Sequence, residues 1–287
     1  MAYLTPAEVA DSTVATVEKK ASLSISAMLI LGALAGAFVA FAAEASTMAT
    51  QDIPLFGPAK YVASIIFGAA LMMVMIAGAE LFTGNTLIIV GVLAGRVSTG
   101  RMVRNWFWVY LGNFIGALMV VALVAGAGLF KVNNGVFAAA TVKAAYAKVG
   151  FSFTEALLRG ILCNWLVTLA VWMAYAAKDI AGKILAIFFP ISLFVISGFE
   201  HSIANMYYIP AGIVAKAQPA VAALTHLTPD QLASLNVANF LLKNLLPVTL
   251  GNIIGGAFFV GTLYWFVYLR KADAARVAGR QSASLGR

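Results

Sequence analysis

The hydrophobic residues of this chain are gathered into six long runs that follow one another along the sequence. A bilayer crossing needs roughly 20 mostly apolar residues, and a helix satisfies its own backbone hydrogen bonds in lipid. Each run is long enough to cross. The pattern predicts six membrane-spanning helices near residues 23–43, 60–93, 105–130, 153–177, 183–214 and 240–268.

Composition supports the same class of protein. Hydrophobic residues make up 62% of the 287 residues and charged residues only 10%, whereas soluble domains carry roughly 25% charged residues. So few charges cannot cover a water-facing surface, which excludes a soluble globular protein. The expected fold class is an all-α membrane protein.

Three regions are expected. Residues 1–22 are polar and lack the apolar core of a signal peptide. Within them, Thr5-Pro6-Ala7-Glu8 has the pattern of a helix-initiating capping box, which predicts a short amphipathic helix at the membrane surface. Residues 23–268 form the transmembrane pore domain, and residues 269–287 form a basic tail.

The basic residues are distributed unevenly between the two sides of the membrane. With six spans both termini lie on one side, and that side collects twelve of the nineteen Lys and Arg residues. Basic loops stay in the cytoplasm, so both termini are expected to be cytoplasmic. The charge of the tail then serves orientation and lipid headgroup contact, and a nucleic-acid partner is not expected.

The second and fifth runs are too long for one plain crossing, and each contains a polar interruption. The segments 78–85 (GAELFTGN) and 198–205 (GFEHSIAN) share Gly, Glu and Asn at a constant offset of 120 residues. Segments 112–116 (GNFIG) and 251–255 (GNIIG) match in the third and sixth runs. Three spans followed by three similar spans must be inverted in the membrane, and inverted repeats with broken helices are typical of a transport path.

Three ionisable residues fall in the interruptions: Glu80, Glu200 and His201. A charge near the bilayer centre costs on the order of 3 kcal/mol, so each is expected to be buried in protein or to line a cavity. For the two glutamates we expect hydrogen bonds from the backbone N–H groups that the helix breaks release. His201 has no counterpart, because Leu81 occupies its repeat position, and imidazole exchanges protons near neutral pH.

The neighbours of these residues suggest how the breaks are built. Gly78, Gly84 and Gly198 permit backbone conformations that other residues avoid. If the breaks meet, Thr83 can hydrogen-bond His201, and Leu81 and Phe82 form an apolar constriction.

Other functional classes fit less well. A water or neutral-solute channel of the aquaporin type carries paired Asn-Pro-Ala motifs, and neither Asn85 nor Asn205 is followed by Pro-Ala. A membrane enzyme or electron carrier needs metal or haem ligands. The chain has one cysteine, Cys163, and two histidines, so no cofactor, metal site or enzymatic activity is expected. A plain membrane anchor leaves the intramembrane charges unexplained.

The motifs together resemble the formate/nitrite transporter family. The strongest likeness is Gly198-Phe199-Glu200-His201-Ser202-Ile203-Ala204-Asn205-Met206, and further matches are 77–83, 105–113, 160–164 and 247–256. The resemblance covers roughly residues 20–270. It implies an aquaporin-like protomer with one pore, a homopentamer, and a place in the cytoplasmic membrane of a bacterium or archaeon.

The resemblance also implies roles for individual residues. Leu71, Leu81 and Phe82 would form a cytoplasmic slit, and Phe67 with Phe194 a periplasmic one. Around a central chamber it places Thr83, His201, Asn164, Asn205 and Asn252, and Lys148 matches a lysine that draws anions toward the pore.

The expected substrates are small monovalent weak-acid anions or their conjugate acids, formate first, with nitrite, hydrosulfide, acetate and lactate as alternatives. Protons and membrane lipid are the other expected partners. A bare anion pays a large desolvation penalty in an apolar slit, and partial dehydration raises its proton affinity. Either His201 donates a proton to the anion, or it stays neutral and only positions Thr83 and its loop.

Overall fold

The computed structural model describes residues 3–270, and that part of the chain is helical apart from its connections and one isolated bridge between Tyr3 and Ala177. Of the predicted tail 269–287, residues 271–287 lie outside the described residues. The first half contains α1 (Pro6–Ala21), α2 (Ile25–Thr50), α3 (Phe56–Phe67), α4 (Ala69–Met72), η1 (Met73–Gly78), α5 (Phe82–Asn85), α6 (Ile88–Leu93) and α7 (Thr99–Gly126).

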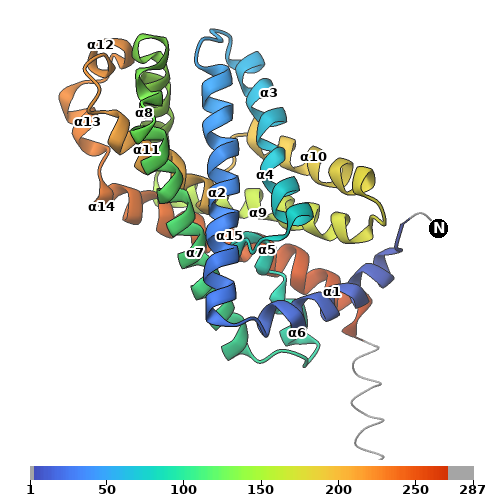
Figure 1. Ribbon diagram of the computed structural model, residues 1–287. Helices are drawn as coiled ribbons and strands as arrows, with labels where there is room; N and C mark the ends of the chain where they lie inside the picture. Colours follow the sequence, from blue (N-terminus) through green and yellow to red (C-terminus); the bar gives the residue numbers. More distant parts are fainter. Residues whose placement is uncertain (1–2, 271–287) are drawn as a thin grey trace, which may run out of the picture.

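The second half begins with η2 (Leu129–Gly135), a connection, and then repeats the order of the first (Figure 1). It contains α8 (Val136–Val149), α9 (Phe153–Ala176), α10 (Ile180–Ile196), α11 (Ser202–Ala215), α12 (Val221–Thr225), α13 (Pro229–Ser234), α14 (Val237–Asn239), η3 (Phe240–Leu245), α15 (Leu246–Ile253), η4 (Ile254–Thr262) and α16 (Leu263–Tyr268).

Five helices are long and apolar enough to cross a membrane unaided: Ile25–Thr50, Phe56–Gly78, Thr99–Gly126, Phe153–Ala176 and Val237–Tyr268. The remaining crossing is divided between α10 and α11, each too short alone, so the fifth predicted span is present as two pieces. The first span continues to Thr50, beyond its predicted end at 43. The third begins at Thr99 because the Ser98 side chain accepts a hydrogen bond from the Arg101 N–H.

The predicted capping box is present at α1, and a second one begins α13. At the start of α1, Thr5 accepts a hydrogen bond from the Glu8 N–H, while the Glu8 carboxylate accepts from the Thr5 N–H at 2.7 Å and from its hydroxyl. The Thr5 donors lower the pKa of Glu8. Thr228 and Gln231 form the same arrangement at α13.

Close helix packing holds each half together through small residues. A Cβ atom on Gly116 of α7 would overlap the Ala33 carbonyl of α2, and a Cβ on Gly36 would overlap the Asn113 backbone. In the second half, Gly251 and Gly255 meet α9 in the same way, at the carbonyls of Leu157 and Ile161. Backbone contact of this kind requires glycine, which explains the matching Gly-Asn-x-x-Gly segments.

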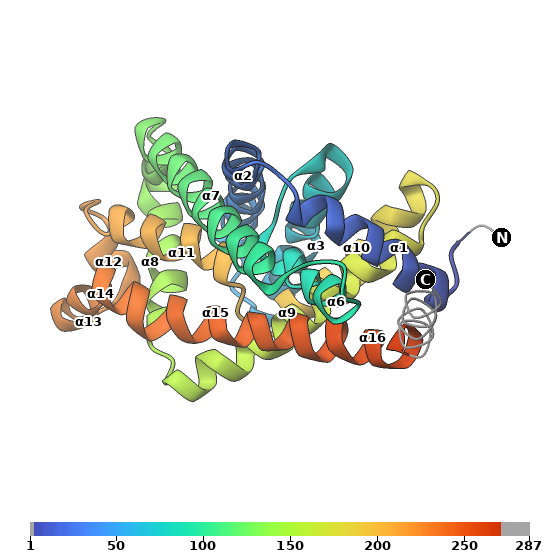
Figure 2. The ribbon, with the colours of Figure 1, turned by 90° about the horizontal axis from the view of Figure 1, so that it is seen from below.

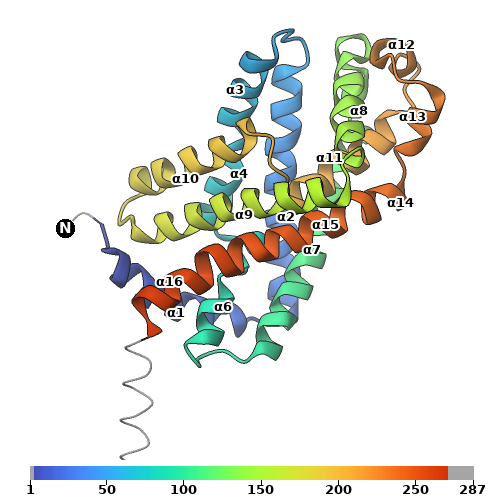
Figure 3. The same cartoon turned by 180° about the vertical axis from the view of Figure 1, so that it is seen from behind.

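Figures 2 and 3 show the long element from α14 to α16 lying beside α9, with α1 and α16 near each other at one end. At the opposite end α8 lies against α11 and α12. We call these ends the α1 side and the α8 side.

Candidate functional site: a pore centre at two helix breaks

The two helix breaks meet inside the molecule. Gly78 and Gly198 have φ angles of 89° and 70°, which glycine adopts readily, and the chain then runs extended through Leu81 and His201 before α5 and α11 begin. The Thr83 hydroxyl and His201 Nε2 lie 2.9 Å apart, which is the expected contact. Gly84 does not need an unusual backbone: it lies inside helix α5, so that expectation is wrong.

His201 also caps helix α11. Its Nδ1 accepts a hydrogen bond from the Ala204 N–H at 3.1 Å. An accepting Nδ1 carries no proton, so the neutral imidazole must carry its proton on Nε2 and donate to the Thr83 hydroxyl. The first turn of α11 therefore fixes one tautomer, and a doubly protonated ring would place two N–H groups against each other.

Two buried asparagines hold the breaks in shape. Asn113 Oδ1 accepts from the Phe82 N–H and Asn252 Oδ1 from the Ser202 N–H, both at 2.9 Å. Their amide groups donate to the Glu80 and Glu200 carbonyls at 2.9 and 3.0 Å. Each also reaches the neighbouring helix, at the carbonyl of Gly32 or Gly160 respectively.

This arrangement corrects the expected role of the glutamates. Their carboxylates do not bind the released N–H groups, because Asn113 and Asn252 already do so. Glu80 instead pairs with Lys20 at 2.7 Å, and Glu200 pairs with Lys148 at 2.7 Å. A buried carboxylate needs a cation or several donors, and each glutamate has both, with its cation supplied by α1 or α8.

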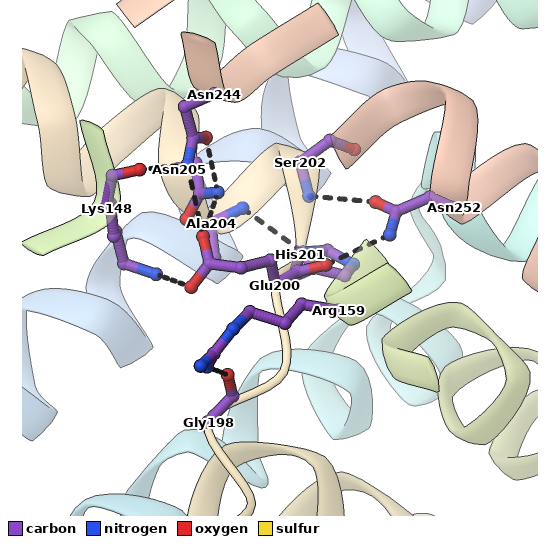
Figure 4. Close-up of polar contacts among 10 residues, drawn as sticks. All are labelled: Lys148, Arg159, Gly198, Glu200, His201, Ser202, Ala204, Asn205, Asn244 and Asn252. Atoms are coloured by element: carbon purple, nitrogen blue, oxygen red, sulfur yellow. Dashed lines mark hydrogen bonds and ion pairs between the residues drawn. The ribbon is translucent and has the colours of Figure 1, made fainter. Parts of the chain in front are cut away.

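Each pair is the centre of a polar cluster, one in each repeat. The second carboxylate oxygen accepts from Asn85 in one half and from Asn205 in the other, both at 2.7 Å. These amides also donate to Asn105 and Asn244, whose own amides reach back to the Lys20 and Lys148 carbonyls. Figure 4 shows the second cluster.

The clusters place several predicted residues away from the chamber. Asn205 belongs to the Glu200 cluster, and the Lys148 ammonium is bound to a carboxylate rather than presented alone. The cluster residues for which the sequence had predicted no role are Lys20, Asn105, Asn113 and Asn244. The recurrence of Asn105 and Asn113 at Asn244 and Asn252, both 139 residues later, was the signal that could have found them.

Asn164 lies directly behind the Thr83 turn. Its amide donates to the Thr83 carbonyl at 3.2 Å and to the Asn252 carbonyl at 2.7 Å, while its Oδ1 is buried without a partner. Gly256 leaves room for this side chain, since a Cβ there would overlap Asn164 and two threonine hydroxyls.

Apolar side chains flank the Thr83–His201 contact. Leu71, Leu81 and Phe82 are buried, and the Phe82 ring meets Tyr110 edge-on with centroids 4.8 Å apart. On the other flank Phe67 meets Phe194 edge-on at 5.7 Å, and Phe194 stacks on His201 at 5.9 Å. The polar centre is thus bordered by aromatic and aliphatic side chains.

A cavity of about 370 Å³ opens beyond Phe67 and Phe194 toward the α8 side, and we call it the α8-side vestibule. Its lining includes Phe67, Phe194 and His201 at the inner end, and polar or charged side chains further out, among them Thr47, Thr50, Gln51, Lys60, Lys148 and Arg159. Within residues 3–270, no group of three His, Cys, Asp or Glu side chains is placed to bind a metal.

The fold and this centre define a polytopic helical membrane protein with a 3+3 inverted repeat and a path at the meeting point of two broken helices. The family model of the formate/nitrite transporters matches residues 7–266, and the chain belongs to this family of membrane transporters.

Relatives agree with this assignment. The chain is 42% identical to the formate channel FocA of Escherichia coli K12, over 85% of this chain and 87% of that one. It is 37% identical to a probable formate transporter of Methanothermobacter thermautotrophicus, covering 94% and 98%. A solved pentameric formate channel with formate bound has a TM-score of 0.77 at 35% identity, covering 86% of this chain and 98% of the other.

Proposed function

We propose that this chain forms a membrane pore for small monovalent weak-acid anions, with formate as the foremost substrate. The observation that carries the proposal is the Thr83–His201 contact at the meeting of the two breaks, set between apolar flanks in a member of this family. Relatives named as formate channels support the choice of substrate.

The proposed constrictions are Leu71, Leu81 and Phe82 toward the α1 side, and Phe67 with Phe194 toward the α8 side. An anion loses its hydration between such side chains and pays a penalty that a neutral acid avoids. Loss of water also raises the pKa of a carboxylic acid substrate. The substrate therefore crosses the apolar slits as its conjugate acid and releases the proton where water returns.

We assign His201 a neutral, positioning role in this step. With Nδ1 accepting from Ala204, the ring cannot hold the second proton that a proton donor needs without breaking the α11 cap. Nε2–H donates to the Thr83 hydroxyl, whose own hydrogen has no acceptor among the described residues and is free to point to a substrate oxygen. The proton on the substrate then comes from hydronium in the aqueous phase, which leaves a water molecule.

Assembly and placement follow from the same resemblance. We propose a homopentamer in the cytoplasmic membrane of a bacterium or archaeon, in contact with lipid, with both termini and the α1 side in the cytoplasm. Support comes from the pentameric relative and from the Lys and Arg excess on the side of the termini.

A proteoliposome flux assay tests the proposal. Formate, nitrite, hydrosulfide, acetate and lactate are presented at two external pH values, with protein-free liposomes as the control. Uptake of formate that is faster at the lower pH is the expected result, since protonated substrate becomes more abundant. Uptake of another of these anions instead would change the substrate, and movement of water or glycerol alone would contradict weak-acid transport.

A further inference from the structure

The side chains that line the α8-side vestibule include more basic than acidic groups. Four charged residues line it: Lys60, Lys148, Arg159 and Glu200. Lys148 and Glu200 neutralise each other at 2.7 Å, and the Lys148 ammonium also lies 5.1 Å from the centre of the Tyr208 ring. The excess charge of the vestibule is therefore held by Arg159 and Lys60.

Arg159 is anchored, and none of the ion pairs found within residues 3–270 includes it. One Nη atom donates to the Gly198 carbonyl at 2.8 Å, and the guanidinium lies 4.3 Å from the centre of the Phe151 ring. Its neighbour Glu155, one turn earlier on α9, is occupied by the Ser152 capping box. A guanidinium has five N–H groups, so most of them remain available. Figure 4 shows this side chain extended beside Glu200, with its end at Gly198.

Lys60 is the second unpaired cation. Its ammonium lies 5.8 Å from the centre of the Phe56 ring, and none of the ion pairs found within residues 3–270 includes it. Lys60, Lys148 and Arg159 all line the vestibule together with Glu200, so the three cations face a common space. Two uncompensated charges that repel each other are stabilised by an anion between them.

The repeat positions equivalent to Arg159 and Lys60 carry no charge. The repeat partner of Arg159 is Leu31, since the carbonyls of these two residues accept equivalent hydrogen bonds from the Glu200 and Glu80 N–H groups. At the offset of 120 residues, Lys60 corresponds to Ile180. Both repeats contain the Lys–Glu pair, whereas the cations at these two positions occur in one repeat position each and not in its partner.

We propose that Arg159 and Lys60 form a carboxylate-binding site in the α8-side vestibule, separate from the pore centre and outside the Phe67–Phe194 pair. The planar guanidinium matches a carboxylate with two parallel hydrogen bonds, and Lys60 contributes a point charge. The site concentrates the anion at this mouth before the substrate meets the apolar slit. This inference rests on the proposed function, because it deepens the recognition of the same substrate.

The test measures initial formate uptake against concentration in membrane vesicles of both orientations at low ionic strength. Arg159→Leu and Lys60→Ile install the apolar residues of the equivalent repeat positions. Each is expected to raise the half-saturating concentration at the α8 mouth by about three- to tenfold, because exposed charges act strongly at low salt. The maximal rate and the half-saturating concentration at the α1 mouth should not change.

Two further variants keep the result interpretable. Lys131→Gln removes an exposed charge outside the vestibule and should leave half-saturation unchanged. Arg159→Lys keeps the charge but cannot form the two parallel hydrogen bonds, and should give an intermediate half-saturating concentration.

Unchanged half-saturation in Lys60→Ile and in Arg159→Leu would overturn the site. A second result would also overturn the site: Arg159→Leu loses transport completely, while Arg159→Lys and Lys60→Ile keep normal half-saturation. Arg159 would then only support the Gly198 loop. Absence of formate flux in the unaltered protein would instead refute the proposed function.

Discussion

At His201, one ring nitrogen caps a helix and the other contacts Thr83, so a single side chain joins the two broken helices. These roles can be separated by substitution. Asparagine is among the best N-cap residues, and its oxygen can accept the Ala204 N–H, but it is too short to reach Thr83.

We therefore predict that His201→Asn folds and assembles normally and transports about five- to tenfold more slowly, the effect of one lost hydrogen bond of roughly 1 kcal/mol. The dependence of flux on external pH should be kept, because the proton comes from hydronium in the aqueous phase. Proteoliposome flux across a pH series provides the measurement. His201→Phe, which removes the cap as well, is the comparison and should also lower thermal stability. If His201→Asn became insensitive to pH, His201 would be the proton donor.

The residues of the pore centre could be predicted from the sequence better than their hydrogen-bond partners could. His201, Thr83 and the two glutamates stand out because polar groups inside apolar runs are costly and rare. Their hydrogen bonds depend on which helix lies behind each break. Asn113 accepts the hydrogen bond of the released Phe82 N–H, so the Glu80 carboxylate pairs with Lys20 instead. Lys20 and Glu80 are 60 residues apart, and no local sequence pattern connects them.

At the scale of the elements, the inverted repeat is more complete than the matching motifs indicated. Residues 31–32 are equivalent to residues 159–160, since the Gly32 and Gly160 carbonyls accept the same asparagine hydrogen bonds. The repeat also includes α1 and α8, through Lys20 and Lys148. The sequence predicted α1 only as an amphipathic surface helix, because its link to the repeat is a single lysine without flanking likeness.

The close contact of α2 with α7 leads to a stability prediction. In Gly116→Ala the new methyl group would overlap the Ala33 carbonyl and force the helices apart. Overpacking of this kind costs typically about 1–3 kcal/mol, so the midpoint of thermal unfolding in detergent, followed by circular dichroism, should fall. Gly100→Ala, on the same helix with no atom near the added methyl group, is the matched control and should change stability by less than about 0.5 kcal/mol. Equal midpoints for both variants would contradict the packing argument.

At the scale of the whole molecule, the two mouths differ although the repeats match. Each side contains a neutral Lys–Glu pair, and the α8-side vestibule also contains Arg159 and Lys60, whose equivalent repeat positions are Leu31 and Ile180. A pore with a symmetric frame and asymmetric mouths can bind substrate differently from each side without any difference in the slits. The biological meaning of that asymmetry depends on which mouth faces the cytoplasm.

Labelling of single cysteines determines this orientation. The native Cys163 is fully buried, so it gives no background with a membrane-impermeant maleimide. Thr99 is exposed at the start of α7 on the α1 side, and Lys131 is exposed on the connection that leads to α8. Because the Lys and Arg excess places the α1 side in the cytoplasm, Lys131→Cys should be labelled in intact cells and Thr99→Cys only after lysis.

The reverse labelling pattern would place the cation-rich vestibule inside the cell, and the carboxylate site would then serve export rather than uptake. Labelling of both variants in intact cells would show a mixed topology, and the charge distribution would no longer explain the orientation.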